Sequence, residues 1–125
     1  MLRLTLDSAP DAPSRGLRAL DRWLEGLDSG LADRVRIAAG EALGNAVEHG
    51  PGGAIDMRWQ PSGQGGTLCV NDHGPADASR FHDARLPDNP LATTGRGLYI
   101  LAEVADAVEA TPAGLCMTFR RRATH

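Results

Sequence analysis

A carboxylate and a carboxamide stand four residues apart in the segment GEALGNAVEHG, as Glu41 and Asn45. At this spacing the two side chains lie on one face of a helix, one turn apart. Asn45 offers a carbonyl oxygen that Mg²⁺ accepts as a ligand. Glu41 can accept a proton from a hydroxyl or a water beside such a cation. The pair therefore has the chemistry to assist a reaction at a phosphate.

The two residues also have an ordinary interpretation, because Glu and Asn on a helix usually belong to a solvated polar stripe. The same helix face continues with Glu48 and His49 one turn later, while the remaining helix surface is mostly apolar. A polar strip along an otherwise buried helix favours a functional role over simple solvation.

Two glycine-bearing turns follow further along the chain, NDHGP and TTGRGLYI. In the first, the Asp72 carboxylate can accept a hydrogen bond from an exocyclic amine, and Gly74 leaves room for a flat base. In the second, Gly95 and Gly97 precede a helical pattern whose free N–H groups would point at anionic oxygens, and Arg96 adds positive charge. A plain β-turn and a flexible helix cap are the competing interpretations. The order of the three segments favours a nucleotide pocket.

Hydrophobic periodicity predicts the elements that must position these residues. It indicates two long helices, one shorter helix and about five strands. The helices are expected at 15–27, 31–49 and 97–105, and the strands around 2–6, 55–59, 68–70, 108 and 115–119. The segment 75–94 lacks a clear period and is expected to form a short lid. This pattern fits an α+β, two-layer α/β sandwich, with helices on one face of a mixed, mostly antiparallel sheet and the other face at least partly open.

Length and charge narrow the class of protein. With 125 residues the chain is expected to form a single domain, 1–125. All 13 basic residues are Arg, so chemistry that needs a lysine is excluded. The net charge of −3 argues against direct binding of nucleic acid. The one basic run, Arg120 to Arg122, is interpreted as a solvated strand end.

The cysteines and the apolar segments indicate the cellular compartment in which the protein works. Cys69 and Cys116 lie in apolar alternating stretches, which favours buried free thiols over a disulfide framework or a metal site. No segment approaches the length of a membrane span, and the N-terminus carries no cleavage signature. A cytoplasmic protein without a membrane partner is therefore expected.

On these motifs the chain resembles the GHKL ATP-binding superfamily, which includes histidine-kinase catalytic domains, DNA gyrase B subunits and stand-alone anti-sigma-factor serine kinases. EALGNAVEHG looks like the family's N box, NDHG like its D-x-G element and TTGRGLYI like its G-x-G-L element, in the family's order. The resemblance covers roughly residues 31–105 and implies a Bergerat-type ATP-binding fold with ATP and Mg²⁺ as cofactors.

The resemblance also implies a role for each matching residue. Glu41 would be the catalytic base, Asn45 the Mg²⁺ ligand, and Asp72 the partner of the adenine amino group. The remaining residues implied at the nucleotide are His49, Gly74, Thr94, Gly95, Arg96, Gly97 and Leu98. A departure from the family pattern follows Gly74, where Pro75 and Ala76 make the adenine-side turn stiffer than a second glycine would.

The short segment before the N box is similar to that of the stand-alone anti-sigma-factor kinases. This likeness implies an ATP-dependent serine/threonine protein kinase that phosphorylates a serine of an anti-anti-sigma (antagonist) domain and can also sequester a sigma factor. The alternatives are a catalytically silent module that titrates a sigma factor or another regulator, and an ATP hydrolase without a protein acceptor. A homodimer fits the family likeness, with Trp23 either at its interface or in the core.

Overall fold

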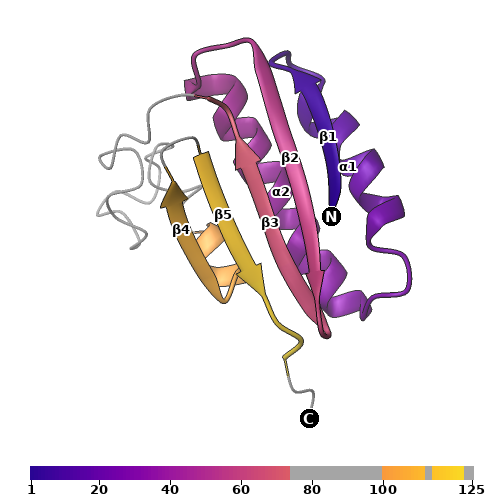
Figure 1. Ribbon diagram of the computed structural model, residues 1–125. Coiled ribbons are helices and arrows are strands. Elements are labelled where there is room, and N and C mark those ends of the chain that lie inside the picture. The colour runs from indigo at the N-terminus through magenta and orange to yellow at the C-terminus, as the bar shows by residue number, and fades with distance from the viewer. Residues whose placement is uncertain (74–99, 112–113, 123–125) are drawn as a thin grey trace.

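The strands of the chain form one open sheet in the order β1-β2-β3-β5-β4 (Figure 1). The computed structural model describes residues 1–73, 100–111 and 114–122, with the side chain of His49 left aside. The strands are β1 (Leu2–Asp7), β2 (Ala54–Ser62), β3 (Gly65–Asn71), β4 (Ala107–Thr111) and β5 (Gly114–Phe119). Every pairing among them is antiparallel.

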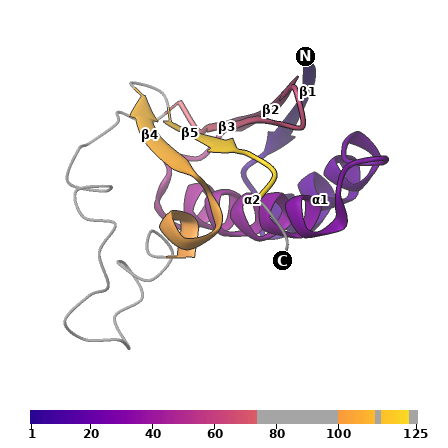
Figure 2. The same cartoon turned by 90° about the horizontal axis from the view of Figure 1, so that it is seen from below.

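Two helices, α1 (Ala12–Trp23) and α2 (Ser29–His49), lie side by side on one face of this sheet, and no helix of the described residues lies on its other face (Figure 2). Residues 100–104, which precede β4, are also helical and lie on the helix side. The α+β two-layer fold expected from the sequence is thereby confirmed.

The core fills the space between the sheet and the helices, because alternate strand residues point toward the helix layer. In β2 the inward residues Ile55, Met57 and Trp59 have 1% or less of their surface exposed. From α2, Ala38 and Ala39 are fully buried. Such small side chains let the helix backbone come close to the sheet. Trp23 is half-buried and packs against this core, which supports the core interpretation of that residue.

Local signals set the limits of α2. At its start, the Asp28 side chain accepts a hydrogen bond from the backbone N–H of Leu31 at 3.1 Å, which satisfies one of the free donors of the first turn. At its end, Gly50 adopts an extended backbone and its N–H donates to the carbonyl of Ala46. The helix therefore runs through Glu41 and Asn45 without interruption.

The prediction of buried free thiols is wrong. Cys69 and Cys116 are joined by a disulfide, and both side chains are partly exposed. Leu68 and Val70 point into the core, so the cysteine between them points to the open face, directly opposite Cys116 of β5. Pairing across a separation of 47 residues is decided by strand register, which neither apolar stretch reveals by itself.

No helix in the described part of the chain is long and apolar enough to cross a membrane. The predicted lid at 75–94 lies outside the described residues, as does the first part of the predicted helix 97–105.

The close approach of β3 and β5 at Gly65 leads to a stability prediction. A Cβ at position 65 would lie 2.0 Å from the carbonyl oxygen of Phe119, a backbone atom that cannot rotate away. We expect Gly65→Ala to lower the free energy of unfolding in urea by about 2 kcal/mol, the usual size of an overpacking effect.

Gly40→Ala is the matched control. Among described atoms, the nearest to its new Cβ is Leu17 Cδ1 at 3.9 Å, an ordinary contact. Removing a glycine from a helix interior should raise stability by about 0.5–1 kcal/mol. Equal stability changes in the two variants would contradict this account of the β3–β5 contact.

Candidate functional site

A small crevice lies between the C-terminal half of α2 and the adjacent ends of β3 and β5. Its lining residues come from all three elements and are Ala42, Asn45, Ala46, Val70, Asp72, Gly114 and Leu115. Its volume is about 10 Å³, room for a single water molecule. An adenine ring is much larger than this volume, so a nucleotide would occupy the space outside the crevice. The crevice itself marks the point where Asn45 and Asp72 meet.

Asp72 is buried at this point, with only 6% of its surface exposed. The turn after β3 sets its direction. The Asn71 side-chain oxygen accepts a hydrogen bond from the backbone N–H of His73 at 2.8 Å, and His73 has a φ of 61°, a conformation that costs energy for a residue with a Cβ. The His73 ring lies 3.1 Å from an oxygen of Asp56 on β2. His73 therefore faces the sheet surface while Asp72 faces the helix.

Gly50 makes room for the Asp72 carboxylate. A Cβ at position 50 would lie 3.1 Å from Asp72 Oδ2 and 2.4 Å from the carbonyl oxygen of Ala46. Its φ of −78° is open to any residue, so space is the reason for a glycine here. The steric role of Gly50 cannot be found from the sequence, because it depends on the end of β3 lying beside the helix.

The structure brings Asn45 and Asp72 to one crevice and leaves Glu41 outside its lining. Glu41 is half-buried and stands one turn earlier on α2, on the same side as Asn45. The other predicted nucleotide contacts, namely the His49 side chain, Gly74, Thr94, Gly95, Arg96, Gly97 and Leu98, lie outside the described residues.

Asn45 brings to the crevice a donor that suits a hard cation. Its side-chain amide offers an oxygen, which Mg²⁺ prefers over nitrogen or sulfur. Among the described residues there is no cluster of three His, Cys, Asp or Glu side chains that could hold a metal by itself. A cation here would take its remaining ligands from water and phosphate.

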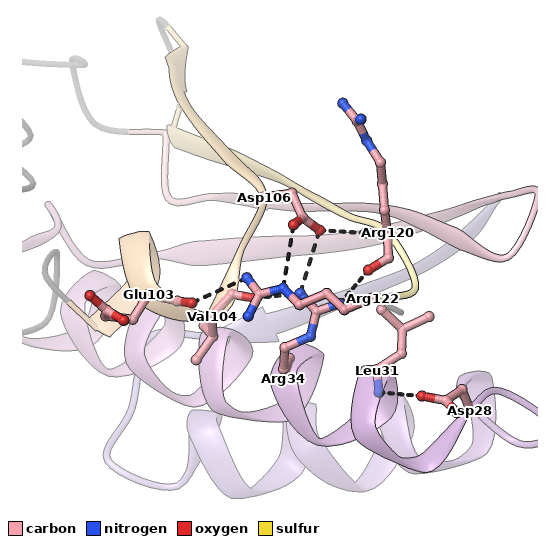
Figure 3. Close-up of polar contacts among 8 residues, drawn as sticks. All are labelled: Asp28, Leu31, Arg34, Glu103, Val104, Asp106, Arg120 and Arg122. Carbon is pink, nitrogen blue, oxygen red and sulfur yellow. Dashed lines mark hydrogen bonds and ion pairs between the residues drawn. The ribbon is translucent and has the colours of Figure 1, made fainter. Parts of the chain in front are cut away.

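Arg34 of α2 ties this helix to the segment that precedes β4 (Figure 3). Its guanidinium donates to the carbonyl of Val104 at 3.0 Å and to Asp106 Oδ2 at 3.4 Å, and it also donates to the carbonyl of Arg120. Only 14% of the Arg34 side chain is exposed. The role of Arg34 cannot be predicted from a local sequence pattern, because its partners lie about seventy or more positions away.

Arg122 completes the same network. Its guanidinium donates to the carbonyl of Glu103 at 3.3 Å and lies 3.5 Å from Asp106 Oδ1. Two guanidinium groups thus meet carbonyls at the C-terminal end of the 100–104 helical turn, where positive charge is favourable. Arg120, Arg121 and Arg122 are exposed, as the sequence predicted for a solvated strand end. Arg122 in addition contacts Glu103 and Asp106.

The pKa of Asp106 reflects this network. Partial burial of the carboxyl group is the largest single influence and favours the neutral acid. The hydrogen bond from the Arg120 backbone N–H at 2.6 Å, together with the hydrogen bond and charge of Arg34 and the charge of Arg122, outweighs it. The pKa of Asp106 is held below its ordinary value of 3.8.

A larger hollow of about 460 Å³ opens at the other end of the sheet. It is lined by the β2–β3 turn and the end of β5, including Gln64, Arg120 and Arg121. None of the residues singled out as site candidates borders it, so size alone does not locate the functional site.

An open antiparallel sheet has helices on one face, and an amide from α2 and a carboxylate from the end of β3 meet at one crevice, which is the α+β arrangement expected of an ATP-binding domain. The family model of the histidine kinase-like ATPase domain matches residues 6–121, nearly the whole chain, and the chain belongs to this family. This match confirms the resemblance to the GHKL superfamily. A comparison with curated proteins gives no match.

The Asp106 network predicts a pH dependence of stability. Because the folded-state pKa is depressed, the ionised carboxylate stabilises the fold above the unfolded-state value, near 3.8, and this contribution is lost as pH falls through the folded-state pKa. Asp106→Asn should therefore be less stable than the natural chain at pH 7, by an amount that shrinks toward pH 3. Urea unfolding at both pH values measures it.

Asp7→Asn is the control, since Asp7 is an exposed residue of an edge strand. The stability gap of this variant should change little between the two pH values. A gap for Asp106→Asn that stays constant between pH 7 and pH 3 would contradict the electrostatic role of the network.

Proposed function

We propose that the chain is an ATP-dependent protein kinase that transfers the γ-phosphoryl group of ATP to a serine of an antagonist protein domain. The observation that carries the proposal is the convergence of Asn45 and Asp72 on one crevice, with Glu41 one helical turn away. A second carboxylate near a cation-binding amide is what a phosphoryl transfer to a hydroxyl needs.

Each residue has a distinct task in this proposal. Asp72, buried at the end of β3, accepts a hydrogen bond from the exocyclic amine of adenine. Asn45 offers its side-chain oxygen to Mg²⁺, which would neutralise charge on the phosphates. Glu41 accepts the proton of the serine hydroxyl while the serine oxygen attacks the γ-phosphorus. The bond between the γ-phosphorus and the oxygen that bridges it to the β-phosphate breaks, so that ADP leaves.

The placement of Glu41 supports its role as a base. Asn45 and Asp72 line the crevice, whereas Glu41 stands at a half-buried position outside it. A protein substrate must bring its serine from solvent to the nucleotide, so the proton acceptor has to remain accessible. Among the described residues no hydrogen bond or ion pair occupies the Glu41 carboxylate.

The proposed partners are an anti-anti-sigma (antagonist) domain as phosphoryl acceptor and a sigma factor as a second, alternative ligand. The open face of the sheet is available for one of them, because neither α1 nor α2 covers it. We further propose that the protein works in the cytoplasm, where such partners reside, and that it forms a homodimer.

Glu41→Gln tests the catalytic base. With antagonist domain, Mg²⁺ and labelled ATP, this variant should transfer label to serine at least about 100-fold more slowly than the natural chain, because a neutral amide cannot take the proton. Its affinity for ATP should stay within about threefold, because Gln keeps the size of Glu and the proposed task of Glu41 is to take the proton of the serine. Transfer rates and calorimetric titration provide the two readouts.

Glu25→Gln is the matched control, because Glu25 is an exposed carboxylate just beyond α1. It should leave both readouts unchanged. Undiminished transfer by Glu41→Gln would refute the assignment of the base. ATP binding without label on any protein would instead favour a silent regulator-binding module, or an ATP hydrolase if phosphate is released steadily.

A further inference from the structure

The disulfide joins the two strands whose ends frame the crevice. Cys69 of β3 and Cys116 of β5 stand directly opposite each other in the antiparallel register, with their Cα atoms 4.1 Å apart. Unlinked residues at the closest antiparallel positions are usually about 4.5 Å apart. The bond therefore adds a covalent link between β3 and β5 where the two strands already lie close together.

The neighbours of the two cysteines along their strands point into the core, so Cys69 and Cys116 point to the opposite face of the sheet. Neither α1 nor α2 covers that face (Figure 2). On that face, Arg58 of β2 stands opposite Cys69, and Glu109 of β4 stands opposite Cys116. A reductant in solution can approach the bond without unfolding the core.

The next rung of the sheet is part of the candidate site. Val70 pairs with Leu115, one position beyond the disulfide in each strand, and both residues line the crevice. Asp72 follows Val70 by two residues, directly after the end of β3, and Gly114 precedes Leu115 on β5. Because the crevice is only about 10 Å³, a small change in the spacing of these strands is large relative to its size.

We propose that Cys69 and Cys116 form a thiol–disulfide exchange site whose redox state sets how firmly β3 and β5 hold Asp72 for the nucleotide. This inference rests on the proposed function only for its consequence, the change in ATP affinity. The co-reactant is a dithiol. Its thiolate attacks one protein sulfur, the protein S–S bond breaks, and a mixed disulfide forms. The second thiol of the reductant then attacks the mixed disulfide and releases the protein sulfur. The protein disulfide thereby gains two electrons and two protons and becomes two thiols, while the dithiol loses them and leaves as a cyclic disulfide.

The proposed cytoplasmic setting agrees with an exchangeable bond. Disulfides in that compartment are usually transient and catalytic or redox-sensing, because the thiol pool keeps most cysteines reduced. An exposed disulfide is the kind that such a pool can reach. Oxidation of the two cysteines would then affect the ATP site through the neighbouring residue pair, Val70 and Leu115.

The test compares the oxidised natural chain, the same chain reduced with dithiothreitol at neutral pH, and the double variant C69S/C116S. Alkylation followed by mass analysis should show two free thiols after reduction of the folded protein. Titration with ATP and Mg²⁺ should give affinity about fivefold weaker after reduction, at the lower end of typical coupling between sites. The double variant should bind like the reduced chain and should not respond to dithiothreitol.

Hydrogen exchange separates the two proposals. The amides of Val70 and Leu115 should exchange faster in the reduced chain and return to the slower rate after re-oxidation. If ATP binds to neither the oxidised nor the reduced chain, the proposed function fails. The exchange rates of these two amides then decide by themselves whether the redox state of the cysteines changes the contact between β3 and β5. A bond that resists dithiothreitol in the folded protein would overturn the present inference. Equal ATP affinity with equal exchange rates in the two states would overturn it as well.

Discussion

The packing of α2 against the sheet is the constraint on which the rest of the structure depends. Ala38 and Ala39 are fully buried and Ala42 is 3% exposed, so the helix lies as close to the strands as its small side chains allow. This contact brings Asn45 beside the end of β3, where Asp72 is buried. A larger residue along this stripe would separate the amide from the carboxylate, since packed interiors do not absorb added volume without strain.

Two further contacts hold the elements around the crevice in place, one on each side of the sheet. The Arg34 guanidinium fastens the first half of α2 to the turn before β4, and the disulfide fastens β3 to β5. One is an ionic contact next to the helix layer, and the other is a covalent bond on the open face. Gly50 completes the arrangement by leaving space for Asp72 at the end of the helix. The crevice is thus defined by backbone spacing as much as by the polar side chains in it.

The sequence predicted elements and faces well, because apolar periodicity records which side of each element is buried. The limits of α2, the inward residues of β2 and the open face of the sheet follow this pattern. What failed or was missed depends on register and on distant pairing. Cys69 lies between two inward residues, so alternation implied an outward side chain, yet only the register reveals Cys116 opposite. Arg34 was missed for the same reason.

Binding of ATP with Mg²⁺ at the meeting point of α2 and β3 is the central claim, and the side-chain amide of Asn45 is its most direct probe. In a nuclear magnetic resonance titration with ATP, the side-chain ¹⁵N signal of Asn45 should shift only when Mg²⁺ is present, while the side-chain signal of Gln64 in the larger hollow stays unchanged. A Mg²⁺-dependent shift at Gln64 with none at Asn45 would contradict the account.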